Sequence, residues 1–416
     1  MAALWNLPTE IVIDIMKHST NLTRLWSLVN ASSRFELIFM AHAWDIVENV
    51  MTKSIPACTQ ALMKIVLATR ASPDLFIGIS DVVGYMSKRE VIVGVGDKDS
   101  NKPREKSLGP MLQSMSPQVL YDFVKLAHTI HGVAHACLDF YIEKSLSAKP
   151  QRIGDADLQD YKSIQRILYS ECQSPGQPFQ PKDFGPPTYL EEQIVIRALW
   201  QLQLFLNMKT ALRMGALDHW SEEDLNQLRT VADIPEMTRL SRDLRCKTNC
   251  LCKVEQILSV VDFVQEITED QHSPIEDVLT RFLHHPPPAV CNKAYHILCS
   301  LKPYPFFGKV GERNTLRDVD SMIERRTKGC VFYRMMTRNN RVPIEPVSFK
   351  PWRRLGFALW QTDRMVELGF LGPKESAYGL VNSEELWFIW RSILTPEEDA
   401  ERRPRNYLTM SIGENG

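Results

Sequence analysis

The chain has 416 residues, of which 44% are hydrophobic and 24% charged, and its net charge is −1. These are ordinary globular values, so they argue against wholesale disorder and against a membrane-embedded chain. Basic residues cluster no further than pairs such as Arg353-Arg354, which argues against the basic stripe of a nucleic-acid binder. We therefore expect neither a nucleic-acid partner nor a membrane partner. At roughly 150 residues per domain, the length indicates two or three domains.

The cysteines and the N-terminal residues bear on the compartment. Nine cysteines are scattered along the chain without the spacing of a disulfide framework, which predicts reduced thiols. The first eight residues have neither a cationic start nor a long apolar run, so we expect no signal peptide. The chain is accordingly expected to be cytoplasmic, nuclear or both.

The first fifty residues predict three short helices. The first begins near Pro8, which fits the first helical position because it has no N–H to leave unpaired. Asn21 is a natural N-cap for the second helix, and Ser33 starts a capping box with Glu36 for the third. The apolar stripes of the three helices are Ile11, Val12, Ile15 and Met16; Leu22, Leu25, Leu28 and Val29; and Phe35, Phe39, Ala43, Ile46 and Val50. A unit this small buries little core alone, so some apolar surface must pack on a partner or on the rest of the chain.

Helical signals also dominate the rest of the chain. The longest candidate runs from about Thr188 to Met214, and Gln201 and Gln203 lie off its apolar stripe. That stripe consists of Leu190, Ile194, Ala198, Leu202 and Phe205. Capping boxes at 273–276 and 395–398 place a proline at the first helical position, and 116–117 and 221–224 are weaker helix starts. The run 90–96 is either a short strand or a helix end.

These signals together predict an all-α protein with an N-terminal three-helix module and a larger irregular helical body. The predicted parts are a helical module at 4–51, a helical region at 52–172 with a polar loop at 96–116, a proline-rich loop at 173–188, a second helical region at 189–336, an aromatic-rich helical unit at 351–395 and a frayed tail at 403–416.

Three histidines invite a metal hypothesis. His131 and His135 have the spacing with which a metalloprotease helix binds zinc, but Gly132 stands where the catalytic glutamate would be. His128 and His135 are ~10 Å apart along a helix, which is too far for one zinc ion. We interpret this face as packed or hydrogen-bonded, and expect no metal and no cofactor.

Other motifs for chemistry are weak. Cys246, Cys250 and Cys252 lack the usual zinc spacing and are interpreted as buried thiols. No P-loop and no nucleophile elbow is present, and Gly94 and Gly96 lack the third glycine of a dinucleotide fingerprint. The aromatic residues near the C-terminal end form either a recognition surface or, as we favour, the core of a small helical unit. They are Trp352, Phe357, Trp360, Trp387, Phe388 and Trp390.

Two segments resemble a known family. Residues 7–11 (Leu-Pro-Thr-Glu-Ile), the isoleucine-rich helix and the leucines after them, and Arg34-Phe35 resemble the F-box motif. Residues 351–360 (Pro-Trp-Arg-Arg-Leu-Gly-Phe-Ala-Leu-Trp), with Arg364 and Leu368-Gly369, are similar to a segment of uncharacterised F-box-like proteins of filamentous fungi. The family often has a cysteine and a tryptophan where this chain has Ala31 and Phe35.

The resemblance implies a function. F-box proteins bind a Skp-type adaptor, which joins them to a cullin and RING ubiquitin ligase. The adaptor contacts that the resemblance implies here are Leu7, Pro8, Ile11, Ile15, Leu22, Leu25, Leu28 and Val29. The chain would then be a non-catalytic adaptor that holds an unknown protein client for ubiquitination. The alternatives are a helical scaffold whose F-box-like start does not bind the ligase core, and a metalloenzyme built on the histidine face.

Overall fold

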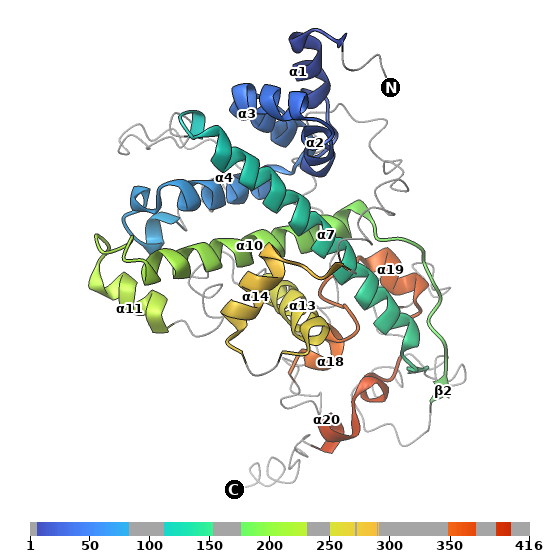
Figure 1. Ribbon diagram of the computed structural model, residues 1–416. Helices are drawn as coiled ribbons and strands as arrows, with labels where there is room; N and C mark the ends of the chain where they lie inside the picture. The colour runs from blue at the N-terminus through green and yellow to red at the C-terminus, as the bar shows by residue number, and fades with distance from the viewer. Residues whose placement is uncertain are drawn as a thin grey trace, which may run out of the picture. The chain divides into compact units, whose positions relative to one another are not determined.

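The computed structural model describes residues 6–82, 112–152, 176–230, 250–270, 273–288, 290, 348–371 and 388–400. Within these ranges the chain is predominantly helical (Figure 1), and the two strands, β1 (Gln151–Arg152) and β2 (Gln177–Pro178), form one short antiparallel pair. The predicted all-α class is therefore confirmed. Every helix in these ranges is too short or too polar to cross a membrane.

The chain folds into two compact units, each built from two separate stretches of sequence. The first takes its residues from Met1–Cys137 and Thr188–Glu324, and the second from Leu138–Pro187 and Arg325–Gly416. The described helices of the first unit are α1 (Thr9–Lys17), α2 (Leu22–Val29), α3 (Ser33–Ser54), α4 (Ala57–Ala71), the 3₁₀ helix η2 (Pro73–Leu75), α10 (Tyr189–Arg213), α11 (Glu222–Thr230), α13 (Cys250–Thr268) and α14 (Ile275–His284). The second unit contains β1, β2, α18 (Lys350–Arg353), α19 (Thr362–Glu367), η5 (Trp390–Ile393) and α20 (Pro396–Ala400). Helix α7 (Pro117–Ser147) contributes residues to both units.

The three predicted N-terminal helices are α1, α2 and α3. Asn21 caps α2 as predicted, because its side chain accepts a hydrogen bond of 2.8 Å from the backbone N–H of Arg24. The prediction of Ser33 as the cap of α3 is wrong by one residue. Ser32 has the extended backbone of a cap and accepts from the N–H of Phe35, whereas Ser33 is already helical. Pro8 likewise is the N-cap of α1 and not its first helical residue.

Helix α10 is the central helix of the first unit (Figure 1). It begins and ends within one residue of the prediction, and Thr188 forms a capping box with Glu191. Gln203, which lies off the predicted apolar stripe, is nevertheless buried and only 2% exposed. Its amide donates to Asn207, which in turn donates to the carbonyl of Val66 on α4. Polar side chains on α10 are thus buried because other helices cover it on several sides, as expected of a helix in the middle of a fold.

Of the other predicted N-terminal helix caps, some form in the structure and one does not. At Thr395 both bonds of the predicted capping box form, with donor–acceptor distances of 2.8 and 3.2 Å to Glu398. The predicted box at 273–276 does not form, because Pro274 is the N-cap of α14 and no side chain caps the helix there. Ser116 and Ser221 accept from the N–H three residues later, as predicted.

Aromatic side chains fill the core of the second unit. Trp352, Phe357, Trp360 and Phe388 are fully buried, which confirms the interpretation of these residues as core. The indole N–H of Trp360 donates to the carbonyl of Leu355 at 2.7 Å and lies 3.1 Å from the hydroxyl of Ser145 on α7. The C-terminal segment therefore completes its core with residues that come more than 200 positions earlier in the sequence.

Several predictions fall outside the described residues. They concern the run 90–96, most of the polar loop 96–116, the side chains of the cysteine cluster, Trp387, the side chain of Trp390 and the tail 403–416. The described part of the proline-rich loop, 176–188, contains no helix but includes the short strand β2.

Candidate functional site

Helix α1 has two rows of apolar residues, of which one is buried and the other keeps exposed surface. Val12 and Met16 are each 1% exposed and pack inside the first unit. Ile11, in contrast, is 45% exposed, and Ile15 is partly exposed. The sequence predicted a single apolar stripe for these four residues. In the structure, Val12 and Met16 form a buried row that packs α1 onto its unit, and Ile11 and Ile15 form a second row that the described residues leave exposed or partly exposed.

The eight predicted adaptor contacts accordingly fall into two groups. Leu22, Leu25 and Val29 are at most 4% exposed, because they face the interior of the first unit. Five others keep exposed surface, namely Leu7, Pro8, Ile11, Ile15 and Leu28. The guanidinium of Arg34 on α3 donates to the carbonyl of Leu7 and ties the start of α1 to the third helix. The surface available to a partner is therefore narrower than the sequence predicted.

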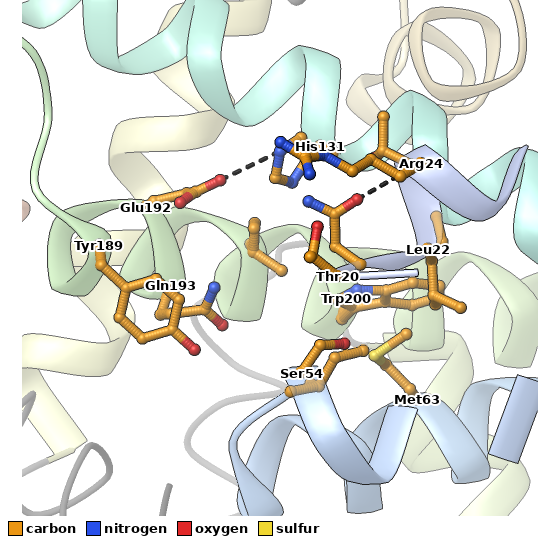
Figure 2. A pocket seen from close by; sticks show the side chains of 15 residues that line it. Thr20, Leu22, Arg24, Ser54, Met63, His131, Tyr189, Glu192, Gln193 and Trp200 are labelled. Carbon is orange, nitrogen blue, oxygen red and sulfur yellow. Dashed lines mark hydrogen bonds and ion pairs between the residues drawn. The ribbon is translucent and has the colours of Figure 1, made fainter. Parts of the chain in front are cut away.

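A pocket of about 350 Å³ lies in the first unit beside the N-terminal end of α2. Its walls come from the loop before α2, the first turn of α2, the end of α3, and α4, α7 and α10. Figure 2 shows Glu192 on α10 and His131 on α7 pointing toward each other at one side of this pocket, with Tyr189 and Gln193 close by on α10. The pocket thus brings two ionisable side chains from helices distant in sequence to a common wall.

These two residues belong to a cluster with His135. The carboxylate Oε1 of Glu192 lies 3.1 Å from Nε2 of His131 and 3.0 Å from Nε2 of His135. The two imidazole Nε2 atoms are 3.2 Å apart. The three atoms thus form a nearly equilateral triangle. Among the described residues, this is a set whose ligand atoms lie close enough together to hold one metal ion.

Burial controls the protonation of the cluster. The side chains of His131, His135 and Glu192 are 11%, 0% and 4% exposed. Burial lowers the pKa of His131 to about 4, so this ring is neutral at pH 7. Burial alone would raise the pKa of Glu192, but the neighbouring imidazole of His131 and the hydrogen bond from His135 lower it, so the group is a carboxylate. At neutral pH the cluster therefore contains a neutral imidazole at His131 and a carboxylate at Glu192.

The structure changes the interpretation of the histidine face. His128 lies outside the cluster, and its ring stacks on Trp26 with centroids 6.3 Å apart. The hydrogen-bonded histidine that we expected is present, since His135 pairs with Glu192. The sequence did not identify Glu192, which is 57 residues from His135. A glutamate in the first turn of a helix is common because it interacts favourably with the helix dipole. The position of Glu192 in the sequence therefore gave no sign that it contacts the two histidines.

Comparison with known proteins finds no significant match to any protein-family model, curated protein or solved structure. The F-box resemblance of the first fifty residues therefore stays a prediction.

Proposed function

We propose that this chain is a non-catalytic substrate-recognition adaptor of a Skp, cullin and F-box ubiquitin ligase. The observation that supports the proposal best is the outward row of α1. Ile11 and Ile15 keep exposed surface while Val12 and Met16 on the same helix are buried. A nine-residue helix that is apolar on two sides can bury only one of them in its own unit, so the other is suited to a partner.

The residues around this row suit the same role. Pro8 is exposed and Leu7 partly exposed at the start of α1, and Leu28 keeps partial exposure on α2. The hydrogen bond from Arg34 to Leu7 holds the start of the helix in place, which lowers the conformational entropy that binding would cost. We name the five residues Leu7, Pro8, Ile11, Ile15 and Leu28 the docking row. Leu22, Leu25 and Val29 support it from within.

In this proposal the chain supplies position and no catalytic group. It holds a protein client near a ubiquitin-conjugating enzyme, and the gain in rate comes from the raised local concentration of the reacting groups. Such a ligase works in the cytoplasm or nucleus, which is the compartment that the reduced thiols predict.

The test is binding of a purified Skp-type adaptor to the full chain and to an Ile11→Arg variant. Replacing a half-exposed isoleucine at an interface removes about 1–2 kcal/mol of apolar burial, and the buried charge adds to the loss. We expect Kd to rise by at least roughly tenfold in titration calorimetry. Ile77→Arg is the matched control, because Ile77 is 68% exposed and lies outside the docking row. That variant is expected to bind as the parent chain does.

Two results would count against the proposal. Equal binding by the parent chain and Ile11→Arg would show that the docking row is not the contact. No binding of the adaptor by the parent chain would favour the alternative, a helical scaffold whose F-box-like start does not reach a ligase.

A further inference from the structure

The triangle formed by His131, His135 and Glu192 has the dimensions of three ligands around one metal ion. Its edges measure 3.0, 3.1 and 3.2 Å. Two ligands bonded at ~2.0–2.1 Å are ~3.3 Å apart in tetrahedral geometry and ~2.9 Å apart in octahedral geometry. A cation about 1 Å above the plane of the triangle would reach all three atoms at such bond lengths. The side chains would need to move by only a few tenths of an ångström.

Hydrogen bonding by itself satisfies this arrangement only in part. If both rings carried their proton at Nε2, two N–H groups only 3.2 Å apart would point at a single carboxylate oxygen. If one ring did not, the N–H of the other ring would be shared between that ring's lone pair and the carboxylate oxygen, and the lone pair would still face the oxygen at about 3 Å. A metal ion removes the conflict, because all three atoms then direct lone pairs at one cation.

The charge of the cluster leads to the same conclusion. Glu192 is a buried carboxylate, and among the described residues no lysine or arginine forms an ion pair with it. The hydrogen bond with His135 offsets part of the cost of burying this carboxylate, and a bound cation would offset more of it. A divalent cation bound by the two imidazoles would supply positive charge at the carboxylate itself.

The cluster lies at the wall of the pocket, so a metal ion held there could bind a further ligand from the pocket side. His131 and Glu192 line the pocket, whereas His135 lies behind them and is fully buried. Three protein ligands with a cavity beside them are the pattern of an open metal site, while purely structural zinc sites have four protein ligands. Arg24 lines the same pocket, and its charge favours an anion there.

We infer that His131, His135 and Glu192 bind one divalent transition-metal ion of the zinc or iron(II) class, with an open coordination position toward the pocket that takes water or a small anion. Imidazole ligands favour these metals over magnesium and calcium, which prefer oxygen. Gly132 leaves α7 without the glutamate of a metalloprotease, so the inference includes no peptidase step. None of the three ligands belongs to the docking row, and the inference is independent of the adaptor proposal.

The experiment uses the tag-free full chain, stripped with a chelator and titrated with Zn²⁺ against a chromophoric competitor. We expect one equivalent to bind, with a Kd on the order of 1 µM or tighter. Glu192→Gln keeps the shape of the side chain but removes its charge, and we expect Kd to rise by roughly 100-fold or more. His131→Ala is expected to weaken binding at least as much. Circular dichroism and thermal unfolding confirm that each variant is folded, and Glu192→Gln carries the test if His131→Ala is not.

His128→Ala is the matched control. His128 lies on the same helix, one turn before His131, but stacks on Trp26 outside the triangle. This variant is expected to bind zinc within about twofold of the parent chain. Equal loss of zinc in His128→Ala and Glu192→Gln would indicate a general effect on the fold and would overturn the assignment.

Spectroscopy identifies the ligands and the metal class. X-ray absorption should show two imidazoles and oxygen ligands, with about four ligands for a zinc-type site and about six for an iron-type site after anaerobic loading with Fe²⁺. The visible spectrum of the Co²⁺ form should shift when azide is added, because an anion occupies the open position. The inference fails if the chain retains no metal, if sulfur appears at ~2.3 Å and places the metal on cysteines, or if azide leaves the spectrum unchanged.

Discussion

Replacement of Gly356 by alanine is expected to destabilise the second unit strongly. Gly356 follows α18 with a φ of +73°, in the left-handed region that favours glycine. A Cβ at this position would lie 2.6 Å from two atoms of the indole of Trp360, Cε2 and Nε1. Trp360 is fully buried, and its N–H donates to the carbonyl of Leu355 at 2.7 Å. The ring therefore cannot move aside without losing this bond.

The magnitude has two parts. The left-handed backbone costs an alanine roughly 1–2 kcal/mol. Ordinary carbon–carbon contacts are about 3.5–4.0 Å, so the indole must shift by about 1 Å, and overpacking of this kind costs roughly 1–3 kcal/mol. The free energy of unfolding should fall by about 2–5 kcal/mol in Gly356→Ala.

Gly185→Ala separates the two parts. Gly185 also lies in the second unit and has a φ of +90°, but no heavy atom outside its two neighbours in the chain lies within 4 Å of its Cβ position. It should lose only the backbone part, roughly 1–2 kcal/mol. Denaturant unfolding monitored by tryptophan fluorescence measures both variants. Equal losses in the two would refute the argument that the Trp360 contact makes Gly356 necessary.

Three further predictions concern single side chains. Arg364 is 1% exposed, and its guanidinium donates to the carbonyls of Gly185 and Pro186 at 3.1 and 2.7 Å. Arg364→Met should therefore lower the free energy of unfolding by about 2–4 kcal/mol and raise hydrogen exchange in the loop 176–187. Unchanged exchange would show that Arg364 does not hold this loop. Asn21→Ala removes the cap of α2 and should lower stability by about 1 kcal/mol in the same unfolding assay, whereas Asn21→Ser should retain most of it. Hydrogen bonds from the backbone and side chain of Ser273 and from Arg281 lower the pKa of Asp270 to about 2. Because the folded pKa is below the ordinary 3.8, this contribution to stability is present above that pH and is lost as pH falls through about 2. Arg281→Met should raise the carboxyl midpoint in an NMR titration, and a midpoint near 3.8 in the parent chain would be evidence against the pairing.

The sequence predicted best those features that depend on neighbours within one or two helical turns. The cap at Asn21 and the capping box at Thr395 follow from side chains that reach the backbone three residues away. The all-α class and the extent of α10 follow from apolar residues that recur at helical spacing. Where two adjacent residues offered the same chemistry, as at Ser32 and Ser33, only the backbone conformation decided which one forms the cap.

Tertiary structure decided which apolar rows are covered and which polar groups meet. Hydrophobic periodicity indicates that Ile11 and Leu25 lie on apolar faces, but it contains no information on what covers them, and the fold buries Leu25 while leaving Ile11 45% exposed. In the same way, the spacing of His131 and His135 predicts that both lie on one face of a helix. The carboxylate of Glu192 joins them only because α10 passes α7 at that level, and the path of the chain between positions 57 residues apart is not encoded in any local pattern.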